Sequence, residues 1–210
     1  MTINRNIAFD LDGTLITCKS RQVAALRIVA DFSSDELERY WFLKRGGQNN
    51  LEALTSLGVS LPEAKIISHK WQEIIENPLL LNFDTLFEDS LSILNSLINA
   101  NYTLHLITAR QHKNYLIIQL KNIGIHGLFK SIFTVNPHHP IGEKSHVLRH
   151  LNPVFFVGDS ETDFFAARMA YKPFKIVSTG QRSEDFLKKI GVDPYINLTE
   201  ALSPIINESH

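Results

Sequence analysis

The sequence has 210 residues, of which 44% are hydrophobic and 20% charged, a composition typical of one globular domain or of a domain with a modest insert. Its 21 basic residues nearly balance its 22 acidic ones, so no net positive field favours nucleic acid as the main partner. No apolar run approaches the ~20 residues of a membrane span, and no signal peptide is visible. The single cysteine, Cys18, fits a reducing compartment. These features predict a soluble cytoplasmic protein.

Short apolar runs alternate with amphipathic stretches along most of the chain, which predicts an α/β fold with a parallel sheet flanked by helices. The apolar runs place strands at 7–9, 103–107, 132–135, 154–157 and 174–177. The amphipathic stretches place helices at about 86–99, 111–123, 143–150, 162–170 and 184–190. Asp84 is the expected N-cap of the first of these helices.

The stretch from Lys19 to Asn82 contains helical patterns and no convincing strand. Ser34 precedes an acidic first turn as in a capping box, Gly58 ends a helix over 49–57, and Pro62 begins another that reaches about residue 76. We therefore expect four helices inserted after the first strand, which form a small all-helical domain. The expected boundaries are 17–84 for this domain, and 1–16 with 85–210 for the α/β core.

The first strand runs into the string FDLDGTL at residues 9–15. Asp10 and Asp12 are thereby placed at the carboxyl end of a strand, where ligands bind in open α/β sheets. Two acids this close repel each other unless a cation lies between them, so a hard ion such as Mg²⁺ is implied. Solvated acids in a loop, or an Asx-turn, explain a bare pair of this kind, but the whole string after an apolar strand is more specific.

With this string the sequence resembles the haloacid dehalogenase (HAD) superfamily of phosphatases and related phosphotransferases. Three further family motifs follow in order: LHLIT at 104–108, GEKS at 142–145 and FFVGDSETD at 155–163. The inserted helices match the family's helical (C1-type) cap, and the rest matches its Rossmann-like core. The resemblance covers residues 7 to about 170.

The resemblance implies a phosphomonoester hydrolase similar to phosphoglycolate phosphatases, which acts on a small organic phosphate through an aspartyl-phosphate intermediate. Asp10 matches the nucleophile and Asp12 the general acid/base, while Thr108 and Lys144 match groups that bind the phosphoryl oxygens. Mg²⁺ is the implied cofactor. Its expected ligands are Asp10, the backbone carbonyl of Asp12, Asp159 and, in a supporting role, Asp163.

Two positively charged positions beside these motifs allow two interpretations each. Ala109 and Arg110 follow Thr108, where many relatives carry a small or amide pair, and Arg110 is either a substrate contact or a surface residue at a helix start. The run Lys44-Arg45-Gly46-Gly47 is either a loop that reads an anionic substrate through Arg45 or a solvated face.

Two other groups of residues admit alternatives. Lys121 and Lys130 are rivals of Lys144 for the family lysine, although both come earlier in the chain. The pair His138-His139 invites a zinc site, but a loop is the better interpretation because no further ligand has suitable spacing.

Two other functions are compatible with some of these features. A phosphomutase would share all four motifs and differ in how the cap restricts water. A non-catalytic binding module would lack an essential group, whereas every motif residue is present here. The sequence indicates neither the substrate nor the oligomeric state.

Overall fold

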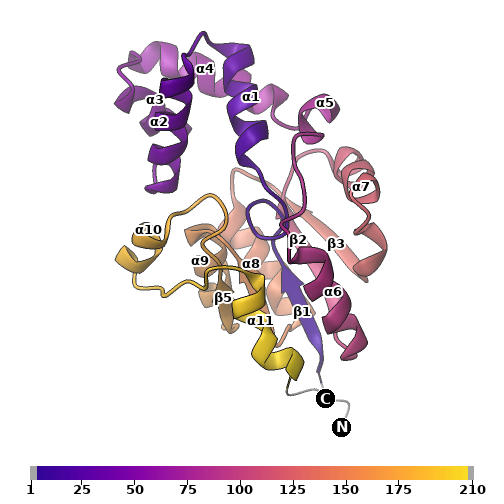
Figure 1. Ribbon diagram of the computed structural model, residues 1–210. Coiled ribbons are helices and arrows are strands. Elements are labelled where there is room, and N and C mark those ends of the chain that lie inside the picture. Colours follow the sequence, from indigo (N-terminus) through magenta and orange to yellow (C-terminus); the bar gives the residue numbers. More distant parts are fainter. Residues whose placement is uncertain (1–3, 208–210) are drawn as a thin grey trace.

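Five parallel strands form the centre of the molecule, in the order β3–β2–β1–β4–β5 (Figure 1). The computed structural model describes residues 4–207. Every strand overlaps an expected one, and the α/β fold with a parallel sheet is confirmed. The strands are β1 (Asn6–Phe9), β2 (Thr103–Ala109), β3 (Ser131–Val135), β4 (Phe155–Gly158) and β5 (Phe174–Ile176).

The central strand β1 pairs with β2 on one side and with β4 on the other. Phe9 is in register with Leu106 of β2 and with Val157 of β4, so the carboxyl ends of three strands lie side by side. The chain winds from β1 to β3 in one direction and from β4 to β5 in the other. β1 is therefore the switch point at which α/β folds place their ligands.

Alternate side chains of the strands build two cores, one on each face of the sheet. Ile7 and Phe9 of β1 point to the face covered by α6 (Ser90–Asn99), α7 (Lys113–Asn122) and α11 (Leu198–Asn207). Ala8 points to the opposite face, covered by α8 (Pro140–Leu151) and α9 (Glu161–Met169). A short 3-10 turn, η1 (His126–Leu128), precedes β3, and α10 (Glu184–Lys189) follows β5. Within residues 4–207, no helix has the length and apolar character to cross a membrane.

The start of one helix was expected at the wrong residue, and another helix was missed. The helix expected from residue 86 begins at Ser90 and has Asp89 at its N-cap position, because Asp84 is buried and ion-paired elsewhere. The helix α11 was not expected at all. It contains Pro204, whose missing N–H makes a helix interior an unfavourable prediction.

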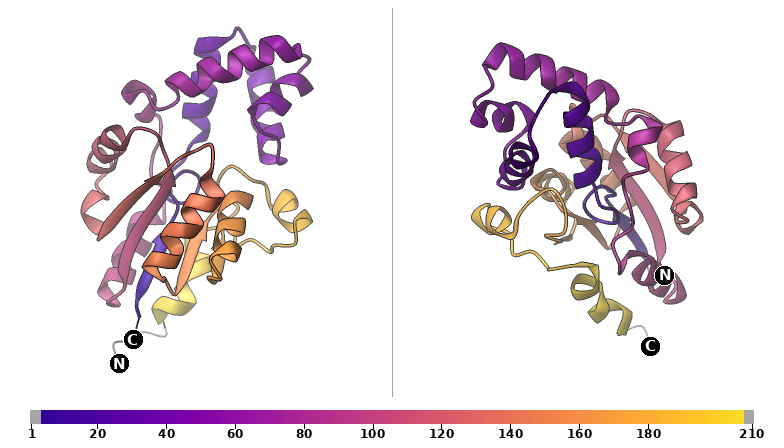
Figure 2. Two further views of the ribbon diagram at one scale, coloured as in Figure 1. Left: turned by 180° about the vertical axis from the view of Figure 1, so that it is seen from behind. Right: turned by 45° about the horizontal axis from the view of Figure 1, so that its top comes forward.

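Five helices, rather than the expected four, lie between β1 and β2. They are α1 (Lys19–Val29), α2 (Ser34–Arg45), α3 (Asn50–Ser56), α4 (Leu61–Ile74) and the single turn α5 (Pro78–Leu81). We call α1–α5 the helical insert. Figure 2 shows it above the carboxyl edge of the sheet, where the strand ends of the switch point lie.

The helical insert has a hydrophobic core of its own, in which Leu26, Tyr40 and Leu54 are buried. The capping box of α2 belongs to Ser33 rather than to the expected Ser34. The Ser33 hydroxyl accepts from the backbone N–H of Glu36, and the Glu36 carboxylate accepts from the backbone N–H of Ser33. The insert thus has a separate core, and its helices α2 and α3 each begin with a capping box.

Two connecting segments join the helical insert to the sheet, and they run side by side. The backbone N–H of Thr17 donates to the Thr85 carbonyl at 2.8 Å, and the N–H of Phe87 donates to the Leu15 carbonyl at 3.1 Å. The insert therefore leaves and re-enters the core at one place.

Candidate active site

A cluster of three buried carboxylates lies at the switch point. Asp10 follows β1, Asp159 follows β4 and Asp163 lies in the first turn of α9, and one oxygen of each lies within 4.8 Å of the others. Lys144 of α8 reaches into the cluster, where its Nζ donates to Asp10 Oδ1 and to Asp163 Oδ1, both at 2.6 Å. The structure thus brings together four residues that the sequence motifs singled out, whereas Lys121 and Lys130 are exposed.

A small pocket of about 140 Å³ opens beside this cluster. Thr108 and Ala109, at the end of β2, line it together with Asp10 and Lys144. The pocket combines a buried ammonium, a hydroxyl that can donate and a carboxylate, in a volume sufficient for a group of phosphoryl size.

The electrostatics of the cluster show that it fits a hard divalent cation. Burial raises the pKa of Asp10 to about 7, although Lys144 acts in the opposite direction. Burial also raises the pKa of Asp159 well above its usual range, and the nearby carboxylates Asp10 and Asp163 add to the effect. One lysine therefore does not neutralise three acids in this low-dielectric site, and the free donors are carboxylate oxygens, which Mg²⁺ prefers.

The Asp159 carboxylate is cradled by two glycine-containing turns. A Cβ atom added at Gly13 or at Gly180 would overlap it, so both positions require glycine at close approach. The backbone N–H of Gln181 donates to Asp159 Oδ2 at 2.6 Å, and the Thr14 hydroxyl lies 3.4 Å from Oδ1. Asp159 is thus fixed toward Asp10, as a metal ligand would need to be.

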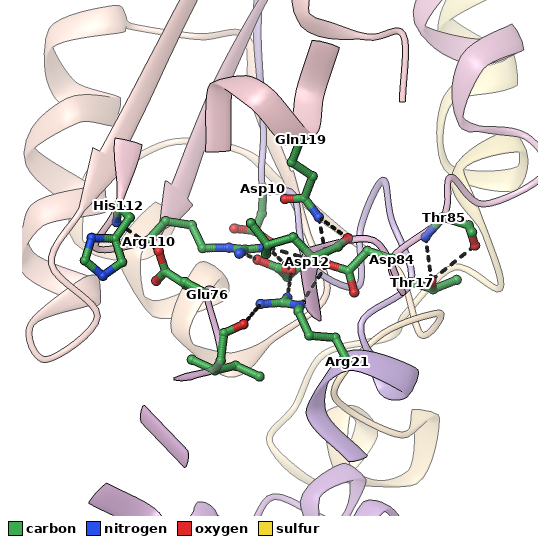
Figure 3. A network of polar contacts seen from close by, with 12 residues as sticks. Asp10, Asp12, Thr17, Arg21, Glu76, Asp84, Thr85, Arg110, His112 and Gln119 are labelled. Carbon is green, nitrogen blue, oxygen red and sulfur yellow. Dashed lines mark hydrogen bonds and ion pairs between the residues drawn. The ribbon is translucent and has the colours of Figure 1, made fainter. Parts of the chain in front are cut away.

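The Asp12 carboxylate lies in a clamp of two arginines, shown in Figure 3. Arg110, just after β2, donates from Nε to Asp12 Oδ2 at 2.8 Å and from Nη2 to Oδ1 at 2.7 Å. Arg21 of α1 donates to Asp12 Oδ1 from the other side. Burial raises the pKa of Asp12, but Arg110 and Arg21 outweigh that effect and hold it below the usual range. Asp12 is therefore a carboxylate in this arrangement.

The same clamp joins the helical insert to the core. Arg21 Nε lies 2.8 Å from Asp84 Oδ2 as an ion pair without good hydrogen-bond geometry, and Gln119 of α7 donates to the same oxygen at 2.9 Å. Arg21, Arg110 and Asp84 of this network are buried, and the Asp12 side chain is 13% exposed. Arg110 is therefore not a surface residue, and that one of its two interpretations from the sequence was wrong.

A cavity of about 520 Å³ lies between the helical insert and the strand ends. Asp12, Ala109 and Gln181 line both this cavity and the small pocket, so the two spaces adjoin. The large cavity is lined mostly by amide, charged and hydroxyl side chains, with Trp71 and Ile75 of the insert as an apolar patch. Its volume is sufficient for a small organic molecule that also reaches into the small pocket.

Arg45 lies outside this cavity's lining, although the sequence suggested it as a substrate contact. Its Nη2 donates to the carbonyls of Ser178 at 2.8 Å and Arg182 at 3.3 Å, so it ties α2 to the loop after β5. Lys44, its neighbour in sequence, lines the cavity instead. Helical geometry explains why Lys44 lines the cavity and Arg45 does not, because adjacent residues on a helix point about 100° apart.

Arg182 completes the contact between that loop and the insert. It binds Glu161 through two hydrogen bonds of 2.5 and 2.6 Å, and its Nη1 donates to the Lys44 carbonyl at 2.7 Å. Gly47 packs against the Phe186 ring with φ of 100°, a backbone conformation that favours glycine.

The two histidines at 138–139 form no metal site in the described part of the chain. His138 lines the large cavity, and neither residue belongs to a cluster of three metal-binding side chains among residues 4–207.

Several residues of the site carry no recognisable sequence signal. Arg21, Asp84 and Glu76 come from the helical insert or its connections and meet the core only after folding. Glu76 accepts from the backbone N–H groups of Gln111 and His112 at 2.8 and 2.9 Å, which satisfies its buried carboxylate at the amino end of α7 (Figure 3). The sequence indicates Arg21 only as a basic residue of the expected helical domain, a few positions after the first motif.

The fold and the site together define a class of protein: a parallel α/β core with a buried acid cluster at its switch point and a helical insert above it. Residues 7–177 match the family model of haloacid dehalogenase-like hydrolases, and the chain belongs to this family of hydrolases. The resemblance noted from the sequence motifs is thereby confirmed.

Among the solved structures with the same fold, three are similar to this chain over nearly their whole length. A candidate phosphatase from Clostridium difficile has a TM-score of 0.76 and 20% identity, over 98% of this chain and 100% of that one. A candidate phosphoglycolate phosphatase from Lactobacillus delbrueckii subsp. bulgaricus has a TM-score of 0.70 and 17% identity, over 97% and 99%. Protein Tyrosine Kinase A of Mycobacterium tuberculosis has a TM-score of 0.72 and 19% identity, over 96% and 98%. At these identities the likeness shows the fold alone. No curated protein matches the sequence significantly.

Proposed function

We propose that this protein hydrolyses phosphate monoesters of small organic molecules, with Asp10 as nucleophile and Asp12 as proton donor and acceptor. The observation that carries the proposal is the buried cluster of Asp10, Lys144 and Asp159 beside a pocket of phosphoryl size, which opens into a larger polar cavity. The family membership and the candidate phosphatases of the same fold support it.

In the first step an oxygen of Asp10 bonds to phosphorus, while the bond between phosphorus and the ester oxygen breaks. Asp12, protonated from solvent when the ester binds, gives this proton to the departing oxygen, and an aspartyl phosphate remains on Asp10. Lys144 and the Thr108 hydroxyl hold the phosphoryl oxygens and offset the charge on them.

In the second step Asp12 takes a proton from water, the water oxygen bonds to phosphorus, and the bond to Asp10 breaks to release inorganic phosphate. The arginines that hold Asp12 favour its ionised form. That form is the one required to accept the proton of water.

The acid cluster is proposed to hold Mg²⁺ through Asp10, Asp159 and the backbone carbonyl of Asp12, with Asp163 in support. The ion would supply positive charge that offsets the phosphoryl oxygens and keeps Asp10 ionised. Asp163 already accepts from Lys144 and from the Ser160 hydroxyl at 2.6 Å each, which suits it to position the lysine as well.

We further propose that residues 17–84 act as a cap domain on a core of 1–16 and 85–210. The helical insert supplies much of the large cavity, and the core supplies the small pocket. The insert would thus set which organic group fits, while the phosphoryl-transfer groups stay in the core.

The proposal is tested by phosphate release from p-nitrophenyl phosphate with Mg²⁺ and with excess EDTA. Asp10→Asn should reduce turnover by roughly a thousandfold or more, because the amide is a poor nucleophile. Asp193→Asn, an exchange of an exposed aspartate, is the matched control. Turnover by Asp10→Asn close to that of the parent, or full activity in EDTA, would refute the scheme. With glucose 1-phosphate, which has further hydroxyl groups to accept the phosphoryl group, an isomerised product without free phosphate would identify a phosphomutase instead.

A further inference from the structure

Lys44 is a buried cation in the large cavity, and its charge is not neutralised. The residue is 8% exposed, and the Nζ donates at 2.7 Å to Asn50 Oδ1, which also accepts from the Tyr40 hydroxyl at 2.7 Å. None of the ion pairs among the described residues includes Lys44. A buried charge is normally paired, so an unpaired one at a cavity wall indicates a missing anionic partner.

The other permanent charges of this site are already matched. Arg21 and Arg110 are neutralised by Asp12 and Asp84, as Figure 3 shows. Glu76, the other acid of the cavity wall, accepts from two backbone N–H groups. An arriving anion would therefore find one free positive charge among the described residues of the cavity wall.

A second observation also points to a ligand. Gln22 of α1 lines the same cavity, is 4% exposed, and its Oε1 has no hydrogen-bond partner within residues 4–207. A buried acceptor without a donor costs free energy unless a ligand supplies the donor, for which a hydroxyl group is suitable. The cavity thus has a free cation and a free acceptor, both on the helical insert.

We propose that Lys44 binds a second anionic group of the substrate, so that the preferred substrates are phosphate monoesters that also carry a carboxylate or a second phosphate. The phosphate that reacts lies in the small pocket by Asp10, and the second anion lies in the adjoining large cavity at Lys44. This inference rests on the proposed phosphatase function and narrows its substrate class.

The experiment compares esters that differ only in the second charge. 3-Phosphoglycerate and glycerol 3-phosphate form one pair, and glucose 1,6-bisphosphate and glucose 1-phosphate form the other, so the pairs separate a carboxylate from a phosphate. We expect at least a tenfold preference in kcat/KM for the anionic member of one pair. Lys44→Met should reduce this preference by about ten- to a hundredfold, mainly through KM, as for one lost charge-assisted hydrogen bond.

Two further variants make the result specific. Lys44→Arg keeps the charge and should retain part of the preference, whereas Lys65→Met removes an exposed lysine of α4 and should retain all of it. Equal use of both members of each pair by the parent protein, or an unchanged preference in Lys44→Met, would overturn the inference while p-nitrophenyl phosphate is still hydrolysed. Absence of turnover on every ester would overturn the proposed function, and this inference with it.

Discussion

Lys44→Met should make the protein more stable at neutral pH, which is unusual for the loss of a buried hydrogen-bonded residue. Burial lowers the pKa of Lys44 from 10.5 to about 8, and repulsion by Arg182 adds to the effect, while Cys18, Glu161 and Glu52 act weakly in the opposite direction. At about 1.4 kcal/mol for each pKa unit, keeping this lysine charged in the folded state costs roughly 3 kcal/mol.

The methionine side chain has a similar length and no charge to bury, but it loses the hydrogen bond to Asn50, worth about 1 kcal/mol. A net gain of roughly 1–2 kcal/mol remains. For a chain of this size each kcal/mol corresponds to about 2–4 °C, so the thermal midpoint should rise by several degrees.

The gain should depend on pH in a defined direction. Below pH 8 Lys44 is charged in both the folded and the unfolded protein, so the full cost applies to the parent. Between pH 8 and 10.5 the folded protein loses this proton before the unfolded one does, so the parent gains stability as the pH rises. The advantage of Lys44→Met should therefore shrink across this range.

The assay is thermal unfolding followed by circular dichroism for the parent, Lys44→Met and the exposed-residue control Lys65→Met, at pH 7 and at pH 9.5. A midpoint of Lys44→Met several degrees below that of the parent at pH 7 would refute the reasoning. It would mean that the charged Lys44 stabilises the fold, and that its charge does not lack an anionic partner.

Two other predictions concern the metal site and the contact between insert and core. Millimolar Mg²⁺ should raise the thermal midpoint of the parent protein, because a ligand of the folded state stabilises it, and Asp159→Asn should abolish most of that rise; an equal rise in both would remove Asp159 from the ligand set. Gly47→Ala should lower the free energy of unfolding by about 1–3 kcal/mol, because its Cβ would meet the Phe186 ring at a φ that favours glycine. Gly142→Ala, in a helix with open space around it, should be neutral or stabilising, and an equal loss in both variants would exclude the contact as the cause.

The sheet could be predicted from the sequence because its signals are local. The strands β1 and β4 contain continuous apolar runs, and the motif residues that follow β1, β2 and β4 meet because parallel strands end at one edge. The positions of Asp10, Thr108 and Asp159 at one edge of the sheet could therefore be predicted from the sequence.

The cavity and the arginine clamp could not be predicted, because they depend on contacts between distant segments. Arg21 meets Asp84 across the insert, and nothing in the neighbourhood of either residue indicates the other. Asp84 resembled a helix N-cap because local sequence suits that role equally well. The choice between Lys44 and Arg45 depended on the rotation of α2 relative to the core, which sequence periodicity alone does not provide.

The paired segments around Thr17 and Thr85 have a consequence for how such a protein can change over time. Because the two ends of the helical insert lie side by side, its length hardly affects the entropy of closing the loop, which grows by only about 0.6 kcal/mol for each doubling. Whole helices can be lengthened, shortened or exchanged there without moving the strands below. The helical insert, to which we assign the choice of the organic group, is therefore free to diversify, while the residues proposed to act on phosphorus stay fixed.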